Sequence, residues 1–195
     1  MVAEKRVKEV RSCVMDSLEI RQDDSGASKI VGHAAVFNSL SEPIAGMFYE
    51  RIKPGAFSRA IKEGQDVRAL FNHDSNYVLG RTKSKTLSLE EDSQGLYIEI
   101  VPPKTRFAED LAVSIERGDI SQMSFGFIVR SETWLSGAGP NGLDIREVVD
   151  VDLFDVSPVT YPAYPDTDVA VRSYQERLNM NADLHFKLRL RKSYL

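Results

Sequence analysis

The amino-acid sequence predicts a mostly β domain, α+β by content, whose strands form a β-barrel or a strongly bent sheet. Short segments rich in β-branched and aromatic residues recur along most of the chain, and Asp, Ser and Gly separate them. Only two or three segments have helical periodicity, and they do not alternate with the strands as in a parallel α/β sheet. With 195 residues, 42% of them hydrophobic, the chain can bury one core.

Two hairpins are expected in the first half of the chain. Segments 14–20 and 29–37 flank an Asp-Asp-Ser-Gly linker, and segments 86–91 and 96–101 flank an Asp-Ser-Gln-Gly linker. Both linkers carry the residues that tight connections between strands require. Each pair of segments should therefore form two antiparallel strands.

Three further elements are expected between these hairpins. Segment 47–52 is a short strand, and a helix follows that begins near Pro54 and ends at Gly64. The strand over 67–72 then leads directly into His73.

The second half of the chain predicts a helix and two long strands. Apolar residues over 107–115 suit a helix packed on a sheet, and Gly118 ends it. Segments 120–130 and 146–159 have strand patterning and are separated by the Gly-rich loop 137–142.

Composition divides the chain into three parts. Residues 1–12 are highly charged and favour a flexible N-terminal arm, and residues 13–172 form the main domain. Residues 173–195 turn polar and then basic, with leucines among the charges. This C-terminal tail is either a short amphipathic helix for a partner or a solvated end.

Charge and composition argue against several function classes. The formal net charge is −4 and the charges are mixed along the chain, so we expect no nucleic-acid partner. No apolar run approaches the roughly 18 residues that span a bilayer, so no membrane contact is expected. The charged N-terminus has no apolar signal core, which favours a soluble, cytoplasmic protein. The single Cys13 cannot form an internal disulfide, and we interpret it as structural in preference to a thiol nucleophile.

Ser124 is a candidate nucleophile because of its place in a strand. Side chains alternate along a strand, so Met123, Phe125 and Phe127 share an apolar face and Ser124 points the other way. Gly126 would keep the neighbouring surface low enough for a substrate backbone. The alternative is an ordinary polar residue on a solvated face.

His73 is the candidate general base. It follows an apolar strand, where rigid structure can position an imidazole for proton transfer. The alternatives are a histidine bonded to a carbonyl, or part of an Asn-His-Asp metal site. No HxH, HxxxH or Cys pair accompanies it, so we expect neither a metal nor a cofactor.

An acid that orients the histidine should follow Ser124. Asp155 is embedded in an apolar strand, where a carboxylate needs a partner, and alternation places it on the face of Leu153 and Ser157. Asp150 and Asp152 remain alternatives, although they suit solvated edge positions better.

Five motifs together resemble one protein family, the prohead serine proteases of tailed DNA phages. The similarity spans residues 14–172 and keeps the order of the motifs. They are Glu50-Arg51-Ile52-Lys53-Pro54-Gly55-Ala56-Phe57, Phe71-Asn72-His73-Asp74, Leu79-Gly80-Arg81-Thr82, Met123-Ser124-Phe125-Gly126-Phe127 and Val156-Ser157-Pro158-Val159-Thr160-Tyr161-Pro162-Ala163-Tyr164.

The resemblance implies a fold similar to the herpesvirus assemblins, a β-barrel surrounded by helices. It implies Ser124 as nucleophile and His73 as base. Assemblins use a second histidine, but His33 and His185 do not lie on the late strand. The phage branch uses an acid there, often glutamate, and this carries over to Asp155.

The resemblance also implies the biological role. Such an enzyme is packaged inside the immature capsid in the host cytoplasm, cleaves major capsid or scaffold protein, and cleaves itself. By the assemblin analogy it forms a homodimer. Backbone N–H groups of Phe125 and Gly126, or Arg146, are the candidate oxyanion donors. The alternative function is a catalytically silent assembly factor that keeps the protease fold.

Overall fold

A computed structural model of the chain describes residues 7–13, 18–22, 28–161 and 170–179. The linker of the first predicted hairpin lies outside these residues, as do residues 1–6 of the predicted arm, His185 and the rest of 180–195. In the described part, no helix has the length and apolarity to cross a membrane.

In the described residues, ten strands form two open sheets. The first has the order β1-β9-β10-β5-β6, with β4 also paired to β10, and the second has the order β2-β3-β8-β7. The strands of the first sheet are β1 (Glu9–Cys13), β4 (Phe48–Ile52), β5 (Arg68–Phe71), β6 (Asp74–Arg81), β9 (Gln122–Leu135) and β10 (Asp144–Val159). Those of the second are β2 (Glu19–Gln22), β3 (Ser28–Val36), β7 (Leu87–Glu91) and β8 (Gly95–Ile100).

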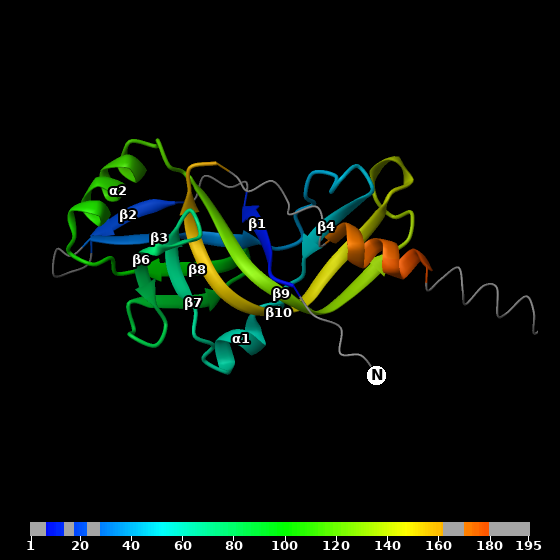
Figure 1. Ribbon diagram of the computed structural model, residues 1–195, viewed down its shortest axis with the longest axis horizontal. Helices are drawn as coiled ribbons and strands as arrows, with labels where there is room; N and C mark the ends of the chain where they lie inside the picture. Colours follow the sequence, from blue (N-terminus) through cyan, green and yellow to red (C-terminus); the bar gives the residue numbers. More distant parts are fainter. Residues whose placement is uncertain (1–6, 14–17, 23–27, 162–169, 180–195) are drawn as a thin grey trace, which may run out of the picture.

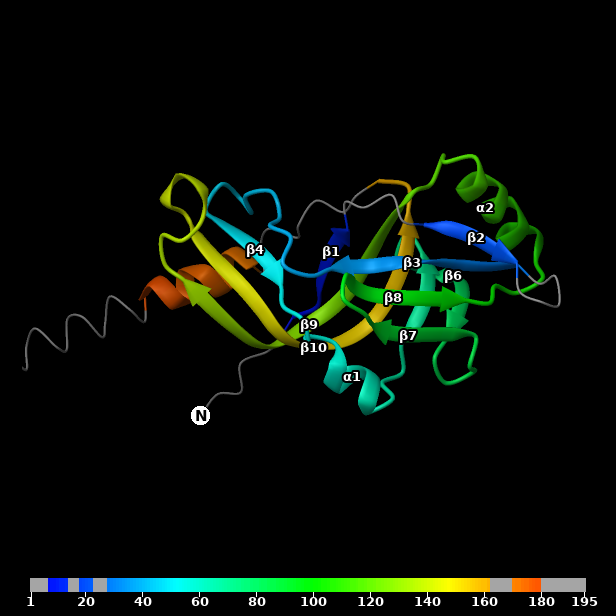
Figure 2. The ribbon, with the colours of Figure 1, turned by 180° about the vertical axis from the view of Figure 1, so that it is seen from behind.

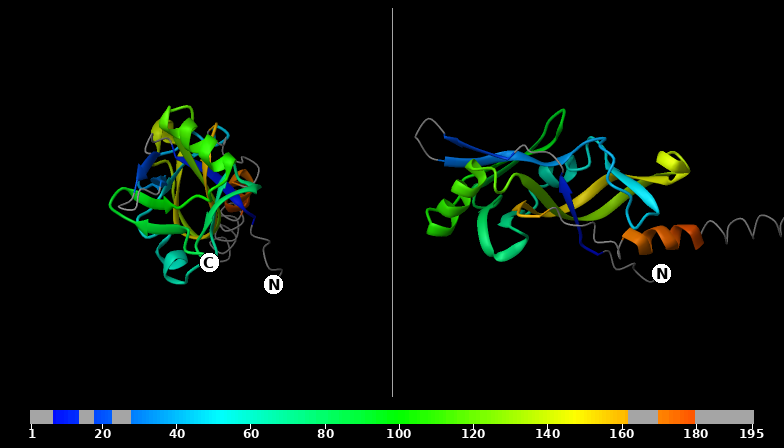
Figure 3. Two further views of the ribbon diagram at one scale, coloured as in Figure 1. Left: turned by 90° about the vertical axis from the view of Figure 1, so that its left-hand side faces the viewer. Right: turned by 90° about the horizontal axis from the view of Figure 1, so that it is seen from above.

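The mostly β, α+β class is confirmed, whereas a closed barrel is not. Within the described residues neither sheet closes on itself, so the assemblin-like barrel stays a prediction. The end-on view shows strands of the two sheets on either side of the interior (Figure 3). Unlike the expected antiparallel arrangement, β10 pairs in parallel with β4 and β5.

The two predicted hairpins occur as β2–β3 and β7–β8, both antiparallel. β9 and β10 form a long curved hairpin that runs across the molecule, joined through the short 3₁₀ helix η1 (Pro140–Gly142) (Figures 1 and 2). Strand β6 was not predicted from the sequence. Strand β1 was not predicted either, because residues 9–12 belong to the expected arm.

Two helices flank the sheets. Helix α1 (Ser58–Lys62) follows the predicted Pro-Gly start, and Gly64 adopts φ +63° just beyond its end. Helix α2 (Arg106–Glu116) begins at Thr105, whose side chain accepts a bond from Ala108 N. Its apolar stripe of Ala108, Leu111 and Ile115 is buried, as 3.6-residue periodicity requires.

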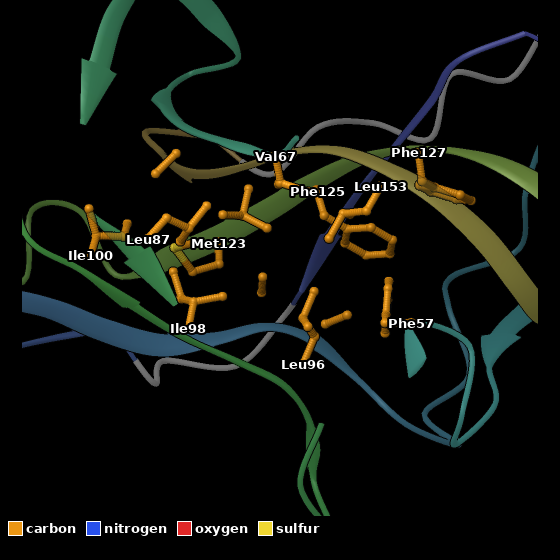
Figure 4. Packing of buried hydrophobic residues seen from close by; sticks show 14 of the residues in the cluster. Phe57, Val67, Leu87, Leu96, Ile98, Ile100, Met123, Phe125, Phe127 and Leu153 are labelled. Carbon is orange, nitrogen blue, oxygen red and sulfur yellow. The ribbon is translucent and has the colours of Figure 1, made fainter. Parts of the chain in front are cut away.

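The main core fills the space between the sheets (Figure 4). Phe125 and Met123 of β9 and Leu153 of β10 pack there with Leu96 and Ile98 of β8. Ring contacts join Phe57, Phe125 and Phe127. At 25 cal/mol per Å², each buried aromatic or aliphatic side chain contributes roughly 1.5–3 kcal/mol. This core makes β9 a rigid support for residues on its other face.

A helix over 170–179 packs on a second, smaller cluster at the other end of the hairpin (Figure 1). Tyr174 lies 5.1 Å from the Phe48 ring and 5.2 Å from Trp134, and Arg177 donates to Asp144. The predicted boundary at residue 172 falls inside this helix. The division into arm, domain and tail stays a prediction.

The N-terminal strand β1 differs from the flexible arm expected for residues 1–12. It pairs antiparallel with β9, from Glu9 opposite Phe127 to Cys13 opposite Met123. Glu9 and Arg11 are buried. Charge density in the sequence favours a solvated arm, but it does not reveal that these charges find buried partners.

Candidate active site

His73 lies in the tight turn between β5 and β6. Asn72 and His73 have φ of 51° and 59°, the two positive values of a type I′ hairpin turn. Asn72 N donates to Pro158 O at 3.0 Å, and Thr160 N donates to Asn72 Oδ1 at 2.9 Å. Because positive φ is uncommon for residues other than glycine, these bonds hold the turn in place. The turn therefore orients the His73 ring, whereas the preceding strand was expected from the sequence to do so.

Ser124 lies opposite the apolar face of β9, as strand alternation predicts. Its neighbours Met123 and Phe125 are in the core, while its Oγ lies 2.7 Å from His73 Nε2. The Ser124 side chain has no exposed surface, and its hydroxyl donates to Arg11 O at 2.9 Å. The face is therefore polar as expected, but it is covered.

Asp155 contacts the other ring nitrogen, His73 Nδ1, through Oδ2. Lys8 Nζ donates to Oδ1, and Ser157 Oγ donates to Oδ2 at 3.1 Å. Burial raises the pKa of Asp155, but the hydrogen bonds from His73 and Lys8 outweigh it and hold the pKa below its ordinary value. The group is thus a carboxylate near neutral pH, able to accept a proton-bearing Nδ1.

A β-bulge sets the orientation of Asp155. Leu153 lies opposite Phe127 and Asp155 lies opposite Gly126, with a register shift between them. Leu153 consequently joins the core while Asp155 faces His73. The expectation that these two residues share a face is wrong, because a bulge interrupts the alternation of side chains. Ser157 does share the face of Asp155.

Gly126 leaves room for the acid. A Cβ at this position would lie 2.5 Å from Asp155 Oδ1 and 2.5 Å from Lys8 Cε. Any side chain there would displace the carboxylate or the lysine. From the sequence, the space above Gly126 was expected to admit a substrate backbone. In the structure it holds the Asp155 carboxylate and the Lys8 side chain.

The alternative acids have other partners. Asp150 and Asp152 accept hydrogen bonds from Arg59, at 2.9 and 2.8 Å. Arg130 also donates to Asp152. Of the acids considered from the sequence, Asp155 is the one that hydrogen-bonds His73 among the described residues.

The candidate oxyanion donors lie in two places. Phe125 and Gly126 are in β9 next to Ser124, opposite Arg11 and Val10 of β1. Arg146 is buried, and its nitrogens donate to Glu9, Glu50 and Glu132 at 2.6–3.0 Å. An oxyanion role would require Arg146 to leave these carboxylates.

Three contacts of the site were missed from the sequence. Ser157 carried a signal, because it alternates with Asp155 in the late strand. Lys8 and Arg11 carried none, because they lie in a segment that reads as a charged arm. Among the described residues, no group of three or more His, Cys, Asp or Glu is arranged to hold a metal ion. His33 pairs with Asp92 at 2.8 Å in the other sheet.

Comparisons with known proteins point to one family and to one similar fold. The family model described as caudovirus prohead serine protease matches residues 16–181. Among solved structures, the bacteriophage T4 capsid assembly protease gp21 has a similar fold, with a TM-score of 0.53 and 12% sequence identity. That match covers 80% of this chain and 99% of the T4 chain. No curated protein matches this sequence significantly.

Proposed function

Because this chain belongs to the caudovirus prohead serine protease family, we propose that it is a serine endopeptidase that cleaves capsid or scaffold protein during prohead maturation. The observation that carries the proposal is the continuous contact from Ser124 Oγ to His73 Nε2, and from His73 Nδ1 to Asp155. A hydroxyl, an imidazole and a carboxylate in this order form the arrangement that activates a serine nucleophile.

Each of the three residues has a defined step. His73 Nε2 takes the Ser124 proton as Oγ attacks the peptide carbonyl carbon, and Asp155 stabilises the resulting imidazolium. The same proton then passes from Nε2 to the leaving amine when the C–N bond breaks. Water hydrolyses the acyl-enzyme by the reverse sequence of proton transfers. Ser157 helps to orient Asp155 through its 3.1 Å bond.

Backbone N–H groups of Phe125 and Gly126 are the preferred oxyanion donors. They lie in the same strand as the nucleophile, and a donor of this kind lowers the barrier by about 3 kcal/mol. Arg146 is less suited to the role because its charge is already neutralised by carboxylates.

Membership of the prohead protease family supports a reaction inside the immature capsid. We extend the proposal to cleavage of the chain itself and to a homodimer, both of which come from the resemblance. A catalytically silent assembly factor is the alternative, and the burial of Ser124 is the observation in its favour.

Co-expression with the neighbouring capsid gene product tests the proposal. We expect shortened capsid protein with the wild-type chain and intact capsid protein with Ser124→Ala, as read by mass spectrometry. Ser88→Ala, a serine on an exposed position of β7, is the matched control and should cleave normally. Equal products from wild type and Ser124→Ala would refute the enzyme and favour the silent factor.

A further inference from the structure

Strand β1 and Lys8, the residue that precedes it, make direct contact with Ser124 and Asp155 of the candidate site. Lys8 Nζ bonds Asp155, and Arg11 O accepts the hydrogen bond of Ser124 Oγ. The strand runs antiparallel along β9, with Ser12 opposite Ser124. A peptide added to this edge of β9 would occupy the same place, so β1 and such a peptide exclude each other.

The contact with Arg11 opposes catalysis. Ser124 has one hydroxyl proton and two acceptors within reach, Arg11 O at 2.9 Å and His73 Nε2 at 2.7 Å. While the proton lies on the bond to Arg11 O, His73 cannot remove it. Lys8 likewise shares the Asp155 carboxylate with His73. The strand thus holds the site in a resting arrangement.

Two charged side chains of β1 enter a buried cluster. Glu9 accepts bonds from Arg146 at 2.8 and 3.0 Å, and Arg11 donates to Glu50 at 2.6 and 3.1 Å. Arg146 also bonds Glu50 at 2.9 Å and Glu132 at 2.6 Å, so the body of the protein presents one cation between two carboxylates, of which Glu50 is the one that also bonds Arg11. Burial of such charges is costly unless each is paired, which makes the cluster selective for partners of opposite charge.

Space for a side chain lies next to this cluster. A cavity of about 260 Å³ is lined by Arg11, Ser12, Leu40, Glu50 and Phe125. Its lining combines apolar residues with the acids Glu42 and Glu50 and the base Arg51. Such a cavity suits the aliphatic stem and cationic end of a basic side chain.

We infer that β1 is a resident substitute for substrate and that Arg146 and Glu50 determine specificity. The substrate peptide displaces β1 and adds to β9 as an antiparallel strand. It places an acidic side chain on Arg146 and, two residues later, a basic side chain on Glu50. Because Arg11 O is the carbonyl on Ser124, the scissile bond is the one that follows the basic residue. This inference rests on the proposed protease function.

Displacement can be measured without catalysis. The probe is a peptide that copies residues 7–12, Val-Lys-Glu-Val-Arg-Ser, added to the full Ser124→Ala chain. Bound peptide should speed amide hydrogen exchange in residues 9–13 while β9 stays protected. Replacing the peptide's glutamate or arginine with glutamine should weaken binding by at least about tenfold, because the first change removes the charged hydrogen bonds to Arg146 and the second removes those to Glu50. Binding that leaves β1 exchange unchanged, or that ignores both replacements, would overturn the inference.

Variants of the resident strand give a second test. Glu9→Gln with Arg11→Gln weakens β1, so the same peptide should bind the Ser124→Ala chain about tenfold more tightly. The matched control is Glu19→Gln with Arg21→Gln, the same spacing on the exposed edge strand β2, and it should leave binding unchanged. Exchange outside β1 verifies that each variant is folded. Equal affinities for both double variants would contradict the resident-strand role.

The two proposals fail separately. If co-expression gives no cleavage but the peptide still displaces β1, the protease function is refuted and a peptide-binding edge remains. If capsid protein is cleaved but the peptide neither displaces β1 nor depends on its charges, the specificity assignment is refuted and the protease stands.

Discussion

The edge strands β1 and β2 carry the same short pattern in opposite surroundings. Glu9 and Arg11 have side chains that are 4% and 8% exposed, whereas Glu19 and Arg21 are 60% and 59% exposed. In both strands the glutamate and arginine also pair with each other. Two identical Glu-x-Arg patterns thus lie in a buried cluster and on an open surface.

The neighbours of the strands account for this difference. Beside β1, the first sheet brings Glu50 of β4, Glu132 of β9 and Arg146 of β10 together. Burial raises the pKa of Glu50, but Arg11 and Arg146 outweigh burial and hold it below its ordinary value. β2 has only β3 as a strand partner, and Arg21 reaches Tyr97 at 3.3 Å. The same two residue types therefore contribute differently to stability and to function in the two strands.

The largest effect should come from changes to the catalytic residues that lie next to β1, compared with an equivalent change in the other sheet. We expect His73→Ala and Ser124→Ala each to lower turnover by several orders of magnitude, and the double variant to be little worse, since the two groups act in one proton transfer. His33→Ala is the matched control, because His33 also pairs with an aspartate, Asp92. Turnover per folded molecule should be nearly unchanged there. Additive effects of the two single changes would argue against a shared step.

A change at Asp155 should be the next largest. Asp155→Asn should fold yet slow turnover by up to roughly 10⁴-fold, because the amide favours the wrong imidazole tautomer. The measurement is single-turnover cleavage with circular dichroism as a check on folding. Near-normal cleavage by a folded Asp155→Asn enzyme would reject the orienting role and reopen the choice of acid.

Stability should separate the buried charges from the exposed ones. Arg146→Ala removes the cation that bonds Glu9, Glu50 and Glu132, leaves Arg11 to balance the buried carboxylates, and should lower the free energy of unfolding by about 3–5 kcal/mol. Arg21→Ala removes an exposed pair and should change it by less than about 0.5 kcal/mol. Urea unfolding followed by fluorescence measures both. Similar values for the two variants would mean that the cluster is not the stabilising unit inferred from its burial.

Acid should weaken the ion pair between Asp155 and Lys8, the residue before β1, and this effect should be smaller than that of Arg146→Ala. The pKa of Asp155 is depressed in the folded chain, so its stabilising contribution is present above the unfolded pKa of about 3.9 and is lost as pH falls through the lower folded value. Asp155→Asn should therefore remove up to about 1.4 kcal/mol per pH unit from the slope of unfolding free energy below pH 4. Unfolding free energies measured between about pH 2.5 and 6 give this slope for the wild-type chain and for Asp155→Asn. Parallel pH dependences for the two proteins would contradict the expected loss.

The sequence was informative where local rules apply. Alternation in β9 predicted that Phe125 and Phe127 are buried and that Ser124 lies opposite them, because a strand with one apolar face has one allowed orientation. The turn residues predicted both hairpins, and Thr105 with Gly118 bounds α2 as helix caps do. These features depend on neighbours within a few residues.

Alternation failed at Leu153 and Asp155, where a bulge depends on the partner strand. The position of His73 depends on a turn anchored to Pro158 and Thr160, more than eighty residues away. Composition could not predict β1, because the charged partners of Glu9 and Arg11 come from two distant strands, β10 and β4.

By itself, then, the sequence determined the mostly β class, the two hairpins, the apolar face behind Ser124 and the family motifs that contain His73. Only the tertiary structure decided that Asp155, and not Asp150 or Asp152, contacts the imidazole, and that residues 9–13 cover the nucleophile. The physical reason is the range of the interactions. Periodicity and turn chemistry act along the chain, whereas the pairing of a buried charge is chosen among groups that only the folded sheets bring together.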